Sequence, residues 1–261
     1  MSTTTRPTSP ARTSAARTLP WVVLVAAVVE VVAPVVTING PGSSPGNGSG
    51  PELLITPVGW AFSIWGVIYA LAIAQAIAAL MVGGSAVSRR VQVDQVVLYL
   101  GAALWIVLAG LDSSLATAAA LLVMLVPAVD AALTIAREPF APRPFALLTQ
   151  ASVGLYAGWV TAAFFLNVST ALVDAGAVEA DALGWQLAVL VVIAVALIGL
   201  MVRTRGLVAF AAAGTWALIG ITVTGIDNDT AEVSLAAAVA AVLLVGATVA
   251  VRASGRHPTT V

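Results

Sequence analysis

The sequence contains no cysteine and no lysine, and its only histidine, His257, lies close to the carboxyl end. Without cysteine the chain has no disulfide bond, no thiolate metal site and no cysteine nucleophile. A single histidine argues against a histidine metal centre and against a Ser-His-Asp triad. The sequence also lacks a Walker motif, a zinc motif and a G-x-S-x-G elbow. It therefore predicts neither a metal site nor a catalytic residue.

Charged residues are also scarce. They make up 9% of the chain, and hydrophobic residues make up 60%, whereas about a quarter of the residues in a typical globular protein are charged. The net charge of −1 gives no basis for binding nucleic acid. We therefore expect an integral membrane protein whose first partner is the lipid bilayer. All eleven basic residues are arginine, which, with the abundance of Ala and Val, indicates a bacterium with a GC-rich genome.

The apolar residues are gathered in runs of the length that crosses a membrane, which takes about 20 residues per helix. Backbone groups in lipid must be hydrogen-bonded within their own segment, so we predict an all-α polytopic bundle. Eight spans are expected, near residues 20–38, 57–81, 93–110, 114–135, 145–172, 184–202, 206–224 and 232–251. The first run is too long for a signal peptide and lacks an Ala-x-Ala site, so we expect it to be retained. Residues 1–18 and 253–261 are predicted to be cytoplasmic tails, the first of them disordered.

The charges between the spans alternate in sign. With eight helices, all arginines lie on one side of the membrane: Arg6, Arg12, Arg17, Arg89, Arg90, Arg137, Arg143, Arg203, Arg205, Arg252 and Arg256. The connections on the other side contain acids and no arginine. The positive-inside rule then places both termini in the cytoplasm, with the protein in the inner (plasma) membrane. A different number of helices would break this alternation.

Two motifs resemble the TspO/MBR family, the tryptophan-rich sensory or translocator proteins. Residues 57–69 read PVGWAFSIWGVIY and are similar to the P-x-W-x-F-x-x-x-W-x-x-[LI]-Y signature that opens the second helix of that family. Residues 159–167 read WVTAAFFLN and match its fifth-helix pattern W-[VS]-x-x-A-x-x-L-N. Trp105 matches the tryptophan of a third-helix N-x-x-W pattern, although Ala102 replaces the asparagine. The chain therefore resembles a divergent member of the TspO/MBR family.

This resemblance implies a five-helix unit over residues 19–173, followed by a three-helix extension over residues 184–252. It also implies binding of a hydrophobic aromatic ligand such as a tetrapyrrole, with no obligatory cofactor. The ligand is expected between the first, second and fifth helices, under the connection 39–56. Its walls are expected to be Trp65 and Trp159, which match tryptophans used by the family in porphyrin binding and light-dependent porphyrin breakdown. That photochemistry is the only enzymatic activity implied.

Several further residues are candidates to line this site: Trp60, Phe62, Tyr69, Trp105 and Asn167. Offsets of three and four residues place Phe62, Trp65 and Tyr69 on one helical face. The small residues Gly66, Gly158 and Ala163 are expected to leave room for a flat ligand beside Trp65 and Trp159. Packing alone explains the buried rings nearly as well, and Trp60 also suits an anchor at the headgroup level. The family forms homodimers, but no small-xxx-small surface is predicted to mark an interface.

Two acids fall inside the predicted spans, Glu30 and Asp130. Ionised groups are costly in hydrocarbon, so intramembrane acids are candidates for function. No arginine is predicted inside the spans to pair with them. They are expected either to join helices as neutral groups or to carry protons in a small-solute permease. The alternatives to a ligand-binding sensor are therefore a proton-coupled permease and a structural membrane subunit.

Overall fold

The computed structural model describes residues 10–38, 52–83, 86–138 and 143–254. Within these residues the elements are α1 (Pro10–Ile38), η1 (Gly59–Ser63), α2 (Ile64–Val82), α3 (Arg89–Ala109), α4 (Ser114–Ile135), α5 (Arg143–Asp174), α6 (Leu183–Arg203), α7 (Val208–Asp227) and α8 (Ala231–Ser254). The described residues contain no strand and eight helices long and apolar enough to cross a membrane. The predicted all-α polytopic bundle is confirmed.

Helix α1 starts earlier than the sequence suggested. It begins at Pro10, inside the segment predicted to be a disordered tail, so residues 10–18 continue the first helix. Proline suits the first turn of a helix because its missing N–H would have no intrahelical partner there. Residues 1–9 lie outside the described residues. So do residues 39–51, which form most of the expected cover over the site.

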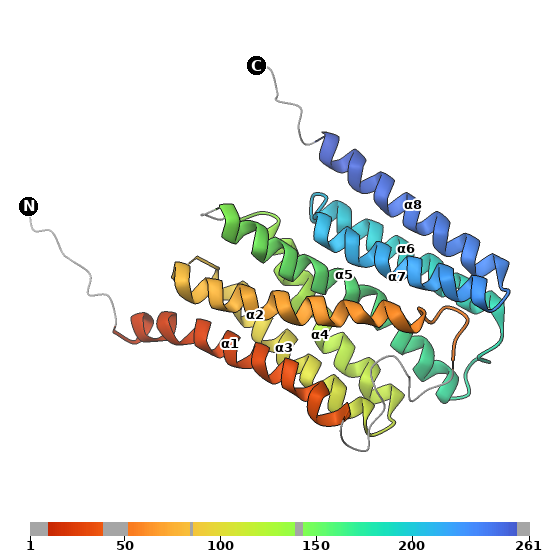
Figure 1. The fold of residues 1–261 in the computed structure, drawn as a ribbon, viewed down its shortest axis with the longest axis horizontal. Coiled ribbons are helices and arrows are strands. Elements are labelled where there is room, and N and C mark those ends of the chain that lie inside the picture. Colours follow the sequence, from red (N-terminus) through yellow and green to blue (C-terminus); the bar gives the residue numbers. More distant parts are fainter. Residues whose placement is uncertain (1–9, 39–51, 84–85, 139–142, 255–261) are drawn as a thin grey trace, which may run out of the picture.

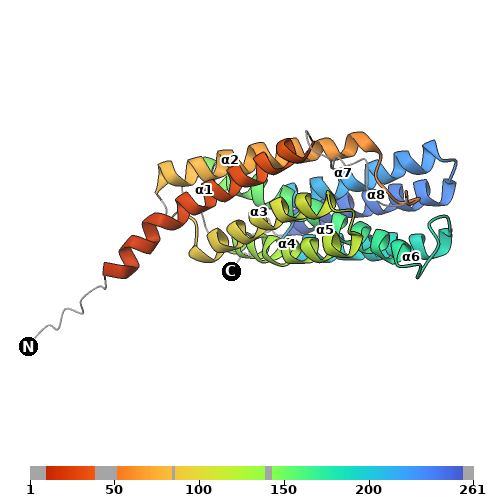
Figure 2. The same ribbon diagram turned by 90° about the horizontal axis from the view of Figure 1, so that it is seen from below.

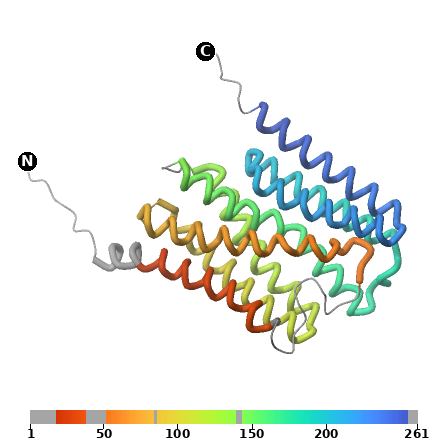
Figure 3. The backbone as a smooth tube through the Cα atoms, in the orientation of Figure 1, coloured from red at the N-terminus to blue at the C-terminus, as the bar shows by residue number. Residues whose placement is uncertain are grey.

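The helices form an elongated bundle in which α5 joins the two halves. Helices α1 to α4 lie on one side of it and α6 to α8 on the other (Figure 1). Helix α1 packs on α2 and α3, α3 packs on α4, and α4 and α2 both pack on α5. Helix α7 packs along α5 and α8, and contacts η1. The tube in Figure 3 shows how the chain reverses direction from each span to the next.

A close backbone contact holds α7 against α5. Gly154 and Gly158 are both buried on α5, and a Cβ atom on Gly158 would lie 2.3 Å from the carbonyl oxygen of Phe210 on α7. Glycines four residues apart allow two membrane helices to approach in this way. This contact lies within one chain, so the expectation that no small-xxx-small surface marks a dimer interface stays a prediction. This surface joins two helices of one chain, so α6 to α8 are tightly packed on the unit that carries the motifs.

Contacts near the helix ends agree with the alternation of charge. At the end that carries the arginines, Arg90 pairs with Asp130, and Arg252 Nη1 donates to the carbonyl of Gly206 at 3.3 Å. We call this the arginine end, and the opposite one the acidic end. At the acidic end the Ser114 hydroxyl donates to the Asp174 carboxylate. Each of these contacts joins two segments that lie on the same side of the membrane if the chain has eight spanning helices. Figure 2 shows the helices running side by side along the long axis of the molecule.

Candidate functional site

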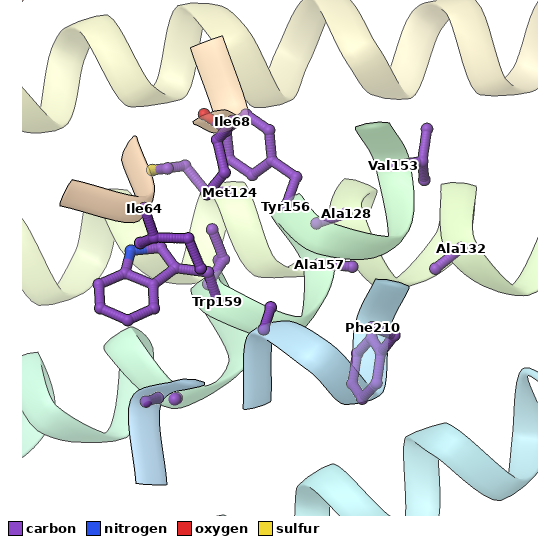
Figure 4. Close-up of a cluster of buried hydrophobic side chains, with 14 of the residues drawn as sticks. Ile64, Ile68, Met124, Ala128, Ala132, Val153, Tyr156, Ala157, Trp159 and Phe210 are labelled. Carbon is purple, nitrogen blue, oxygen red and sulfur yellow. The ribbon is translucent and has the colours of Figure 1, made fainter. Parts of the chain in front are cut away.

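Six aromatic side chains from three neighbouring helical segments meet in the interior, and we call them the aromatic cluster. Its members are Phe62, Trp65, Tyr69, Trp105, Tyr156 and Trp159. The spacing of three and four residues along η1 and α2 turns the first three toward α5 and α3, as the sequence indicated. Figure 4 shows Tyr156 and Trp159 of α5 next to Ile64 and Ile68 of α2.

Trp65 lies at the centre of the aromatic cluster. Its ring stacks on Trp105 with centroids 5.7 Å apart and an interplanar angle of 26°. It meets Trp159 edge to face at 6.3 Å and Tyr156 at 5.9 Å. Trp65 is 6% exposed and Trp159 is 3% exposed. Aromatic pairs in these geometries contribute about 0.5–1.5 kcal/mol each beyond burial, so the cluster also stabilises the contact between α2, α3 and α5.

The indole N–H groups of Trp105 and Trp159 differ in their partners. Trp105 Nε1 donates to Asn167 Oδ1 at 3.3 Å, and Asn167 Nδ2 donates to the carbonyl of Ala163 at 3.1 Å. Asn167 therefore orients Trp105 from α5. Trp159 Nε1 is buried and has no hydrogen-bond acceptor among the described residues. Leaving a buried donor unpaired costs about 1–3 kcal/mol, so an acceptor brought by a ligand would be stabilising there.

Trp60 and the two glycines do not join the cluster. Trp60 is 45% exposed and packs on Trp216 of α7, with ring centroids 5.0 Å apart. The position of Trp60 at the acidic end agrees with an anchor near the headgroups. Gly66 is exposed, and Gly158 is occupied by the α7 contact, so neither leaves room over the tryptophans. The rings contact one another directly, and a planar ligand must separate them or bind along their edges.

The two acids predicted to lie inside the membrane have different surroundings. Asp130 is 29% exposed and accepts hydrogen bonds from two guanidinium nitrogens of Arg90. The expectation that it has no arginine partner is wrong, because α3 begins at Arg89 and its first turn carries Arg90 to the end of α4. Asp130 thus belongs to an ion pair at the arginine end.

Glu30 is completely buried, at 0% exposure, inside the span of α1. The Tyr156 hydroxyl lies beside its carboxylate, and Tyr69 and Tyr99 are close enough to interact with it electrostatically. The pair is not well aligned for hydrogen bonding, since both carboxylate oxygens and Tyr156 Oη lack a partner of ordinary geometry. The tyrosines connect this acid to the aromatic cluster.

Further polar side chains extend this buried region. Gln95 Nε2 donates to Gln75 Oε1 at 2.8 Å and to the Tyr99 hydroxyl at 3.2 Å. These three residues were not among the candidates predicted from the sequence, and neither was Asp94, which lies beside Asp130. Polar residues within apolar spans were the available signal. No group of three or more His, Cys, Asp or Glu residues that could hold a metal ion occurs in the described part of the chain.

Comparison with known proteins agrees with the motifs. A family model described as TSPO-like protein matches residues 18–250 and thus spans α6 to α8 as well as the first five helices. Comparisons with curated proteins and with solved structures gave no significant match.

Proposed function

We propose that this chain, which belongs to the family of TSPO-like proteins, is a membrane receptor or sensor that binds a planar aromatic ligand such as a tetrapyrrole. The observation that carries this proposal is the convergence of Trp65, Trp105 and Trp159, from three helices, into one buried group. Trp65 and Trp159 belong to the two motifs that resemble the TspO/MBR family. Trp105 belongs to the third-helix pattern, which this chain matches only in part.

The chemistry of the aromatic cluster suits such a ligand. Indole rings offer flat apolar faces, and Trp159 Nε1 offers an unpaired donor. Binding sites for small molecules are mostly apolar and contain a few polar groups that fix orientation. A hydrophobic ligand reaches the cluster by separating α2 from α3 and α5, at the cost of the ring contacts that the ligand then replaces.

A proton-coupled permease is the second candidate, and one observation favours it. Glu30 is buried in the interior and has no partner of ordinary geometry among the residues that the structure describes, which is the setting of a proton carrier in a membrane. Asp130 does not support this function, because it forms an ion pair with Arg90. If the protein is a permease, Glu30→Gln abolishes uptake driven by a pH gradient in proteoliposomes, whereas Asp130→Asn leaves it in place.

The sensor proposal is tested by titrating the detergent-solubilised protein with protoporphyrin IX while tryptophan fluorescence is followed. Wild type is compared with the double variant Trp65→Phe, Trp159→Phe, and with Trp21→Phe. Trp21 is exposed on α1, outside the cluster, so its variant controls for the loss of an emitting ring. We expect saturable binding in wild type and in Trp21→Phe, and none in the double variant. Equal binding in all three would contradict the proposal.

We also propose that the arginine end faces the cytoplasm, as the positive-inside rule requires. The absence of cysteine makes a direct test simple, since one introduced thiol is the only one in the chain. Ala175→Cys places a thiol on the exposed acidic end, and Ser254→Cys places one on the exposed arginine end. In intact cells a membrane-impermeant maleimide should label the first variant only, and labelling of the second alone would reverse the orientation.

A further inference from the structure

Glu30 is a buried acid that has no cation beside it among the described residues. It lies near the middle of the span Thr18–Thr37 and is 0% exposed. Among the described residues the arginine side chains lie at or near the arginine end of the helices, remote from this position. Burying an unpaired acid in hydrocarbon is costly. A buried acid that is present despite this cost is a candidate to bind a positively charged ligand.

All three tyrosines of the chain lie close enough to this acid to interact with it electrostatically. They come from three different helices: Tyr69 from α2, Tyr99 from α3 and Tyr156 from α5. These are the titratable groups that interact with the Glu30 carboxylate across the packed helices, and none of them is cationic at neutral pH. The titratable neighbours of Glu30 among the described residues are therefore phenol groups.

Two of these tyrosines, Tyr69 and Tyr156, belong to the aromatic cluster. The ring of Tyr69 lies 5.6 Å from that of Trp65, and the ring of Tyr156 lies 5.9 Å from it. A buried carboxylate beside tryptophan and tyrosine rings combines two attractions for one kind of ligand. The carboxylate pairs with a protonated nitrogen, and the ring faces attract the same positive charge by cation–π interaction.

We infer that Glu30, Tyr69, Tyr99 and Tyr156 form a subsite for a protonated nitrogen, so that the preferred ligand is a planar aromatic cation. This inference rests on the proposed function, because it takes the aromatic cluster as the place where the flat part of the ligand binds. It names the chemical class of that ligand. A flat molecule without charge gains nothing from Glu30, and one that carries a carboxylate near Glu30 is repelled.

The test uses two planar three-ring probes that differ in charge, 9-aminoacridine, which is protonated at neutral pH, and anthracene, which is neutral. Binding to the solubilised protein is followed by quenching of tryptophan fluorescence. We expect wild type to prefer the cation by at least about tenfold, the effect of one hydrogen bond to a charged group. Glu30→Gln keeps the shape of the side chain and should lose most of this preference, keeping only what the ring faces contribute by cation–π interaction. Glu232→Gln, an exposed acid on α8, should retain the preference.

The outcomes separate the two proposals. If both probes bind to wild type with equal affinity, or if Glu30→Gln keeps the preference, the cation subsite is refuted and the aromatic site stands. If neither probe binds and protoporphyrin IX also fails to bind, the proposed function itself is refuted. Tyr156→Phe, which keeps the ring and removes the hydroxyl, should weaken the preference for the cation without abolishing it. If Glu30→Gln fails to fold, the comparison of the two probes on wild type still tests the cation subsite.

Discussion

Replacing Gly158 by alanine tests whether close backbone packing joins the two halves of the bundle. A Cβ atom at this position would lie 2.3 Å from the carbonyl oxygen of Phe210, and 2.9 Å from the Cβ atom of Ala213. Both neighbours belong to α7, and the nearer one is a backbone atom that no rotamer change can move. The added methyl group therefore forces α5 and α7 apart as whole helices.

The expected cost follows from overpacking in a rigid contact. Extra carbon atoms in a well-packed interior cost about 1–3 kcal/mol, and occasionally more. Because the clash at Gly158 involves backbone on one side, we expect about 3 kcal/mol of lost stability, at the upper end of that range. The next residue along the chain is Trp159, so the displacement should also weaken ligand binding at the aromatic cluster.

Stability is measured by thermal unfolding in detergent, followed by circular dichroism, together with titration of SDS into mild detergent. The matched control is Gly199→Ala on α6, where a Cβ atom has no neighbour within 4 Å and the position is exposed. We expect the control to unfold at the wild-type temperature or slightly above it, and Gly158→Ala to unfold well below it. Equal unfolding temperatures for the two variants would refute the proposed α5–α7 contact.

Three further substitutions should have smaller effects, each measured by the same unfolding assay. Trp216→Phe removes an indole hydrogen bond of 2.8 Å to η1 and should cost about 0.6–1.7 kcal/mol, the usual value for such bonds in membranes. Arg90→Gln breaks the exposed ion pair with Asp130 and should cost less than about 1 kcal/mol; a larger loss would mean that the pair is buried. Gly101→Ala should be nearly neutral, since its added Cβ meets the flexible Met124 side chain at 3.0 Å.

The number and position of the spans could be predicted from sequence because membrane insertion depends on local properties. Hydropathy sets the length of each span, and the alternation of arginines and acids fixes the count. The start of α1 could not be read in this way. Residues 10–18 are largely polar, so hydropathy does not mark them as part of a span, although Pro10 suits the first turn of a helix.

The face of each helix was also predictable, whereas the pairing of helices was not. The spacing of Trp65 and Tyr69 placed both on one side of α2, and the structure turns that side toward Trp159 and Tyr156. Periodicity does not say which helix lies opposite, so the contribution of Trp105 from α3 depended on the family resemblance. The residue pattern Gly-x-x-x-Gly at Gly154 was present in the sequence, but only its close fit to α7 gives it meaning.

The two intramembrane acids show why a sequence position alone does not assign a role. Glu30 and Asp130 both interrupt apolar runs and look equivalent in the sequence. Asp130 lies near the end of α4, and there Arg90 on the first turn of α3 neutralises it at the membrane boundary. Glu30 lies among tyrosines in the interior, where no arginine of the described chain reaches it. Burial and the identity of the neighbours therefore leave Glu30 as the one acid of the pair suited to bind a proton or an external cation.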